Sequence, residues 1–166
     1  DNGFVMFAYL DDGSLVKVHK NSGVYVNGNI FDNSIQKQIN VDDGFLKFEI
    51  KKQKENEFKI VTPTSVASVK GTTFFLDANL NQDVFYGFEG IVEILNIESN
   101  QVSQLLESTK ITSLPDGSLN IENITQEDLV FINQIQLDSG VELEEIQEED
   151  DETGSLDDQT NTYQII

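Results

Sequence analysis

The sequence contains no cysteine, no tryptophan and no arginine, and its 166 residues include one histidine and two prolines. Without cysteine the chain cannot form a disulfide, offer a thiolate nucleophile or hold a metal through thiolates. With His19 as its single histidine, it cannot build the histidine pair on which zinc sites usually rest. Its apolar runs stay far short of the roughly 20 residues that a membrane span needs. These absences exclude thiol chemistry, histidine-based zinc sites and a membrane span within this chain.

Positive charge is also scarce. Ten lysines face 30 acidic residues, giving a formal net charge of −20, and such a chain repels phosphate backbones. We therefore expect no nucleic-acid partner. The imbalance is local, because all ten lysines and 15 acids lie at or before Lys110, whereas the rest of the chain has 15 acids and no base.

The acidic residues concentrate near the C-terminus, where 11 of the 21 residues in 138–158 are Asp or Glu. A block of like charge with so few apolar residues favours a flexible, solvated tail at 141–166. Calcium binding and a docking role are the alternatives, although the spacing does not match an EF-hand loop. The ending Tyr163-Gln164-Ile165-Ile166 is apolar again, which indicates either a short strand that docks or the point where a longer chain was cut.

The first two thirds of the chain show short β-type runs. The nearly continuous apolar run 4–10 predicts a strand buried on both faces. Asp12-Gly13 separates it from the run 15–20, which predicts a β-hairpin. Further turns are expected at Asn21–Gly23 and Asn27-Gly28, and the lysine-rich stretch 51–57 is expected to be an exposed turn.

Further runs rich in β-branched and aromatic residues predict strands at 24–26, 45–50, 58–61, 66–69, 72–76, 83–88 and 91–95. About ten strands at intervals of roughly 8–12 residues are typical of an all-β fold. We therefore predict a two-layer antiparallel β-sandwich or roll, with a short β-solenoid as the alternative.

One helix is expected near the end of this region. Thr125 can cap the first turn, and acidic residues follow it at the positive end of the helix dipole. Leu129 and Ile132 mark one face, with Ile135 or Gln136 continuing it. Gly140 is expected to end the helix. A strand is the alternative, because Val130 to Ile132 are also β-formers.

No catalytic arrangement stands out. His19 is expected to be exposed on its strand beside Lys17 and Lys20, with no nucleophile to pair with it. Carboxylates are numerous, but no spacing singles out a glycosidase-like pair, and Gly87–Gly90 does not form a phosphate-binding loop. Asp11-Asp12 and Asp42–Gly44 are explained by turn chemistry, with calcium as the alternative. We predict a non-enzymatic protein without catalytic residues, metal or cofactor.

Residues 58–74 resemble the signature of the FecR (ferric-citrate regulator) domain family, in which a strand ending in Thr-Pro precedes a small-residue strand, Arg-Gly-Thr and an aromatic. Residues 88–94 resemble its Glu-Gly strand, and 4–18 resemble its paired strands around Asp-Gly-Ser. The resemblance covers roughly residues 3–120. The matching signature residues are Thr62, Pro63, Ala67, Val69, Lys70, Gly71, Thr72, Phe74, Glu89 and Gly90.

Two features depart from the family pattern. Lys70 stands where the family has arginine, so a bidentate contact made by that arginine would be lost. Leu105–Ser108 replaces an element that contains glycine. The family also has a hairpin before the strand at Phe4, so we expect the domain to be truncated at its start.

The physical chemistry of the signature residues indicates structural roles before functional ones. Pro63 cannot donate to a ladder and suits a strand end, and Gly71 suits a positive φ or a close backbone approach. Thr62 and Thr72 can bond local backbone groups, and Phe74 is expected to pack inward.

The resemblance implies a FecR-like β domain at 1–120, followed by a helical extension at 121–140 and the acidic tail at 141–166. It also implies a protein-interaction module of the bacterial cell envelope, periplasmic or extracellular, that binds an envelope receptor and serves transmembrane signalling or sigma-factor regulation. The alternatives are a scaffold component of an envelope or cell-surface assembly, including a homo-oligomer, and a glycan- or small-molecule-binding enzyme. The last predicts a deep pocket with convergent carboxylates.

Overall fold

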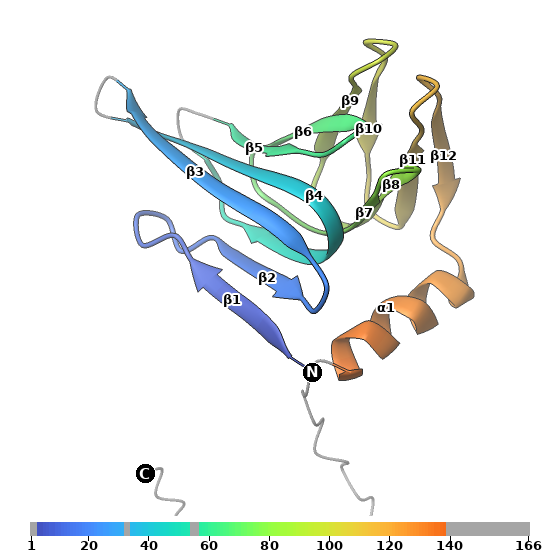
Figure 1. The fold of residues 1–166 in the computed structure, drawn as a ribbon, viewed down its shortest axis with the longest axis horizontal. Helices are drawn as coiled ribbons and strands as arrows, with labels where there is room; N and C mark the ends of the chain where they lie inside the picture. The colour runs from blue at the N-terminus through green and yellow to red at the C-terminus, as the bar shows by residue number, and fades with distance from the viewer. Residues whose placement is uncertain (1–2, 32–33, 54–56, 139–166) are drawn as a thin grey trace, which may run out of the picture.

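The computed structural model describes residues 3–31, 34–53 and 57–138, with only the backbone described for 29–31 and 34–35. Within these ranges the chain forms twelve strands and one helix (Figure 1). The strands are β1 Phe4–Ala8, β2 Leu15–His19, β3 Gly23–Phe31, β4 Ser34–Ile50, β5 Phe58–Val61, β6 Ser65–Val69, β7 Thr72–Asn79, β8 Gln82–Glu89, β9 Val92–Asn96, β10 Val102–Leu105, β11 Thr109–Ser113 and β12 Leu119–Asn123, and the helix is α1 Gln126–Asp138. Gly140 and the acidic tail predicted at 141–166 lie outside the described residues.

One continuous sheet folds over into two layers that share the long strand β4. The first half of β4 pairs with β3 and β5, and the second half of β4 pairs with β2 and β7. The order then runs β5-β6-β9-β10 in one layer and β7-β8-β11-β12 in the other, while β1 adds to β2. The described pairs are antiparallel except for β4 with β5. The predicted all-β sandwich or roll is therefore confirmed, and the pairing is not that of a solenoid.

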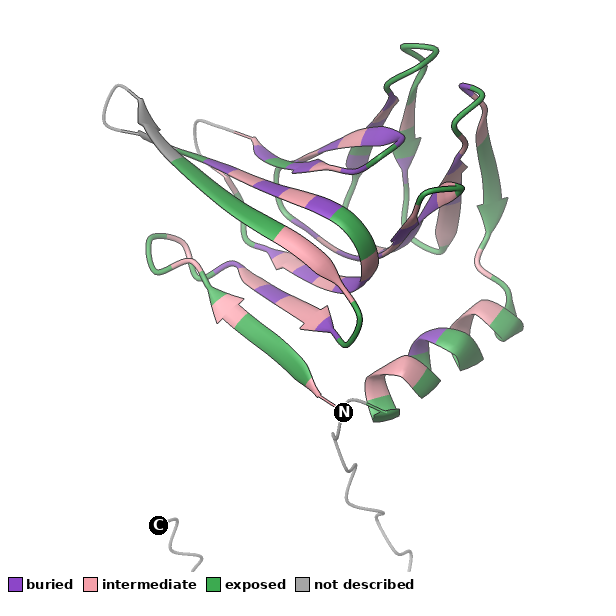
Figure 2. Ribbon diagram, in the orientation of Figure 1, coloured by how far each residue is buried: buried purple, intermediate pink, exposed green. Residues whose placement is uncertain are grey.

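The core lies between the two layers because alternate side chains along each strand point inward. Along β4 in Figure 2, buried positions alternate with more exposed ones. Phe48 of β4 stacks on Phe74 of β7, with ring centroids 4.8 Å apart, at the centre of this core. Ala67 and Val69 of β6 pack from the opposite layer and are fully buried.

Three predictions for the first four strands were wrong: a buried β1, a turn at Asn27-Gly28 and a turn at 42–44. The hairpin of β1 and β2 around Asp12-Gly13 is confirmed, but β1 is largely exposed because it is an edge strand. Asn27-Gly28 does not form a turn, since it pairs with Lys37 and Gln38 inside β3 and β4. Residues 42–44 likewise do not interrupt β4, where Gly44 (φ 117°) allows the strand to bend from one layer into the other.

The predicted helix is confirmed as α1, and it covers the outer face of one layer. Asp128 N–H donates to Thr125 Oγ1 at 3.2 Å, and Thr125 N–H donates to Asp128 Oδ2 at 2.8 Å, which forms a reciprocal N-terminal cap. Ile132 is buried in a second apolar cluster with Phe45 and Tyr86. The described part of the chain contains no helix with the length and apolar character needed to cross a membrane.

The helix also explains why His19 is buried, contrary to the exposed position expected from its neighbours. Its ring lies 5.4 Å from the ring of Phe45, and only 3% of the residue is exposed. Burial, followed by the charge of Lys17, lowers the pKa of His19 to about 4, although a hydrogen bond with the backbone of Ile135 in α1 acts in the opposite direction.

Candidate functional site

The structure divides the signature residues between a buried polar cluster and a surface groove, with the apolar ones in the core. Ala67, Val69 and Phe74 are fully buried between the layers. Thr62 and Pro63 lie in the tight connection between β5 and β6. The remaining signature residues lie at the other end of the sandwich, where β6 ends, β7 begins and β8 ends. They are Lys70, Gly71, Thr72, Glu89 and Gly90.

The Thr-Pro connection is organised by Asp83, a fully buried carboxylate at the start of β8. Its Oδ2 accepts hydrogen bonds from Thr62 Oγ1, from Thr64 Oγ1 and from Thr64 N–H at 3.0 Å. Burial raises the pKa of Asp83, and the threonine hydrogen bonds oppose this rise without overcoming it. Thr62 therefore stabilises the turn through a distant strand as well as through Ser65, whose N–H it accepts at 2.9 Å.

This buried cluster extends to residues of β9 and β11 as well. Thr64 Oγ1 lies 3.0 Å from Ser113 Oγ of β11, and Ser113 Oγ accepts from Asn96 Nδ2 at 2.8 Å. The cluster thus joins β6, β8, β9 and β11 at one end of the sandwich. This cluster was not predictable from the sequence, because single polar residues on different strands carry no spacing signal.

At the opposite end, two signature glycines allow three chain segments to approach closely. A Cβ on Gly71 would lie 3.0 Å from the Cα of Lys52, so a side chain there would crowd the segment after β4. A Cβ on Gly90, whose φ is 75°, would lie 2.8 Å from the carbonyl oxygen of Gly71. These glycines are needed because backbone occupies the space that a side chain would fill.

A groove of about 760 Å³ lies over this junction. Its lining comes from both layers and includes four signature residues. The lining residues are Glu49, Ile50, Lys51, Lys52, Glu57, Ser68, Lys70, Gly71, Thr72, Thr73, Glu89, Ile91, Glu93 and Gln104. We call this hollow the signature groove.

The signature groove has charges of both signs on its walls. Three lysines and four glutamates contribute, and Lys70 Nζ lies 3.1 Å from Glu57 Oε1. Lys70 is otherwise open to solvent, with 75% of its side chain exposed. It presents a mobile point charge rather than the planar fork of the family's arginine. Ile91, which is 54% exposed, adds an apolar contact at the rim.

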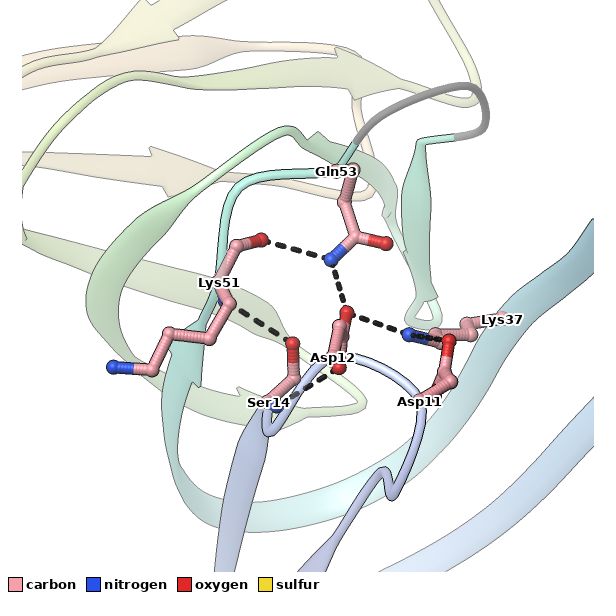
Figure 3. A network of polar contacts seen from close by, with 6 residues as sticks. All are labelled: Asp11, Asp12, Ser14, Lys37, Lys51 and Gln53. Atoms are coloured by element: carbon pink, nitrogen blue, oxygen red, sulfur yellow. Dashed lines mark hydrogen bonds and ion pairs between the residues drawn. The ribbon is translucent and has the colours of Figure 1, made fainter.

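An ion-pair network around the buried Lys37 adjoins this end of the molecule (Figure 3). Lys37 of β4 is 3% exposed, and its Nζ lies 2.8 Å from Asp11 Oδ2 and 2.6 Å from Asp12 Oδ2. Burial alone would raise the pKa of Asp12, but hydrogen bonds from Lys37, Gln53 and Ser14 lower it to about 2. The two aspartates therefore form a turn whose charge is compensated by an internal lysine.

The same network holds one wall of the signature groove. Gln53 Nε2 donates to Asp12 Oδ2 and, at 2.8 Å, to the carbonyl oxygen of Lys51 (Figure 3). Ser14 Oγ accepts from Lys51 N–H at 3.1 Å. Gln53 N–H donates to the carbonyl oxygen of Lys70 at 2.7 Å, which ties the network to the signature loop. Residues 51–53 are thus anchored through their backbone, while the side chains of Lys51 and Lys52 are exposed and can contact a partner.

Two of the groove glutamates form ion pairs. Of the groove glutamates, Glu57 pairs with Lys70, and Glu49 pairs with Lys47 at 2.5 Å. His19 lies under α1 and does not line the groove. Within the described ranges, no group of three His, Asp or Glu side chains is placed to hold a metal ion.

Comparisons with known proteins agree with the fold and the signature. Two crystal structures from Parabacteroides distasonis ATCC 8503, each described as a "putative anti-sigma factor", superpose with TM-scores of 0.63 and 0.60 at 18% and 20% identity. The superpositions cover 80% of this chain and 61% and 62% of those chains, so this chain spans about three fifths of their length. No curated protein matches the sequence. The family model described as "FecR protein" matches residues 7–93, which is more than half of the sequence, and the chain therefore belongs to the FecR family.

Proposed function

We propose that this chain is a non-enzymatic interaction module of the bacterial cell envelope, on the periplasmic or outer side, that takes part in regulating a sigma factor. Its FecR family membership and its structural likeness to chains described as anti-sigma factors support this proposal. The observation that carries the binding role is the convergence of Lys70, Gly71, Thr72 and Glu89 on one open groove.

The groove chemistry favours a protein partner. The lysines and glutamates of the lining can pair with both signs of charge along an extended segment or loop. Exposed Ile91 and partly buried Thr73 add contacts that a polar small molecule would not need. Hydrogen bonds of Gln53 hold the backbone of this wall, so binding requires little reordering of the wall. An envelope receptor with such a segment is the partner that we propose.

The test compares two isoleucines with equal exposure. Ile91 lies at the groove and Ile121 lies on β12 outside it, and both are 54% exposed. In cells that carry the full-length protein, Ile91→Asp is expected to lower transcription from the sigma-dependent promoters at least tenfold. Ile121→Asp is expected to leave it unchanged, with both variants present at normal levels in the envelope.

Two results contradict the proposal. One is equal transcription in cells carrying Ile91→Asp and the unsubstituted protein. The other is a defect confined to the integrity of an envelope assembly, which supports the scaffold hypothesis instead. Fractionation of the full-length protein provides a separate check, because recovery in the cytoplasm contradicts the proposed location without bearing on the groove.

A further inference from the structure

The two layers of the sandwich differ in what lies on their outer faces. α1 covers the outer face of the layer that contains β7 and β8, where Ile132 is buried in one cluster with Phe75 and Tyr86. α1 is the one helix of the described residues, and Figure 1 shows it away from β5, β6, β9 and β10. We call the outer face of these four strands the outer β6 face.

Apolar side chains form a continuous row across the outer β6 face. Val61 pairs with Val66, Val66 pairs with Leu95, and Leu95 pairs with Val102, so the four residues share one face of the sheet. The first three are partly exposed, and Val102 is 53% exposed. They alternate along their strands with fully buried core residues, which include Ile60, Ala67 and Ile94. With neighbouring strands about 4.8 Å apart, the row spans about 14 Å.

A polar row lies beside the apolar one, two residues along each strand. Lys59 pairs with Ser68, and Ser68 pairs with Glu93, so a positive and a negative charge lie on either side of β6. Gln104 continues the row opposite Glu93. Lys59 and Glu93 are both exposed, and neither forms an ion pair with another of the described residues. The outer β6 face therefore presents one charge of each sign beside an apolar row.

These two rows are complementary to themselves. A two-fold axis that runs along the strands between β6 and β9 lays the outer β6 face on the same face of a second copy. Each member of the apolar row then lies on another member, with Val66 on Leu95 of the second copy. The same rotation brings Lys59 next to Glu93 of the second copy, and it opposes no like charges within the rows. The register alone thus matches apolar with apolar and plus with minus.

We infer that the outer β6 face is an interface between two copies of this chain. The two sheets pack face to face with aligned strands, as in the two layers of a sandwich. An interface built mainly from one apolar row per copy falls below the about 1,200 Å² of stable complexes, so the association is weak. The chain is therefore monomeric at the low micromolar concentrations at which unfolding is measured, and it dimerises when concentrated.

The net charge of −20 does not prevent this association. Residues 1–110, which include all four strands of the face, carry 10 lysines and 15 acids and thus a formal charge of only −5. Physiological salt screens exposed charges beyond about 8 Å. The inference goes beyond the proposed function, because it concerns the binding of the chain to itself. Ser68 and Glu93 also line the signature groove, so the two surfaces adjoin.

The first test reverses the charges one at a time. Lys59→Glu and Glu93→Lys in the full chain each place like charges together across the interface, and each is expected to raise the dimer dissociation constant about tenfold. An equimolar mixture of the two variants is expected to restore it, because both contacts of the mixed dimer again join opposite charges. Sedimentation equilibrium at about 0.15 M salt measures the dissociation constants. A mixture that associates no more tightly than either variant alone overturns the inference.

The second test places a charge in the apolar row. Val102 is 53% exposed, and Ile121 on β12 of the other layer, at 54%, is its matched control. Val102→Asp is expected to raise the dimer dissociation constant about tenfold and Ile121→Asp to leave it unchanged, with far-UV circular dichroism confirming that both variants are folded. Equal dissociation constants for the two variants overturn the inference. A full chain that stays monomeric up to about 1 mM also overturns it, whatever covers the face, and leaves the groove proposal intact.

Discussion

At the scale of single residues, the buried hydroxyl of Thr62 illustrates how a turn motif depends on a distant strand. The hydroxyl donates to Asp83 and accepts from Ser65 N–H, so it serves two partners that water cannot reach. Removing it leaves both partners without that bond, and the loss is dominated by the cost of unsatisfied buried groups.

Thr62→Val is therefore expected to lower the free energy of unfolding by about 1 to 3 kcal/mol, because it keeps the shape of the side chain and deletes its hydrogen bonds. Urea denaturation monitored by far-UV circular dichroism measures this change in the free energy of unfolding. Thr112→Val is the control, since Thr112 is partly exposed and makes no side-chain hydrogen bond to the described residues. A loss no larger than that of the control contradicts the assigned role of Thr62.

At the scale of secondary-structure elements, α1 decides the environment of His19. The ring of this histidine lies between β2 and the helix, so its neutral form is favoured when the helix is packed. The folded pKa of about 4 is below the ordinary value of 6.5, which means that the unfolded chain binds the proton more readily than the folded protein. The stability that neutral His19 contributes is present above pH 6.5 and is lost as the pH falls from 6.5 to 4.

We expect His19→Gln to reduce the loss of stability across this pH interval by about 1 to 3 kcal/mol, because glutamine does not titrate there. Chemical denaturation of both proteins at pH 7.0 and 4.5 provides the measurement. The contribution of Asp12 does not mask the effect, since its pKa is lowered to about 2 and its stabilisation is lost only between about pH 4 and 2. Identical pH dependence in the two proteins contradicts the coupling of His19 to α1.

At the scale of the whole molecule, Lys37 connects the two layers. It belongs to the half of β4 that pairs with β3, and its ammonium group reaches the turn between β1 and β2 in the other layer. Its removal leaves Asp12 facing a desolvated space without a counter-charge, which costs more than the pair itself contributes.

Lys37→Met is expected to lower the free energy of unfolding by about 2 to 3 kcal/mol, at the lower end for broken buried pairs because Asp11 is partly exposed. The double variant Lys37→Met with Asp12→Asn is expected to regain part of this loss, since it removes the unpaired charge as well. Thermal unfolding of the three proteins, with exposed Lys59→Met as the control, tests the expectation. A double variant less stable than Lys37→Met contradicts it.

Several elements were predictable because their causes are local. The Asp12-Gly13 hairpin, the strands around Phe74 and the Thr125-capped helix depend on turn residues, alternation and a capping side chain within a few positions. The signature residues were also visible as a motif. Their division between a buried cluster and a groove was not, because Asp83 contacts Thr62, Lys37 contacts Asp12 and Gln53 contacts Lys70 across 17 or more residues of sequence.

The sequence by itself determined the β-rich class, the family, the chemistry that is excluded and the concentration of acidic residues after Lys110. These properties follow from composition and from neighbours along the chain. Only the tertiary structure decided that His19 is buried, that Lys37 is an internal counter-ion and that β1 is an exposed edge. The physical reason is that burial and pairing depend on which strands and helices come together, and alternation along one strand is the same whether another layer covers it or water does.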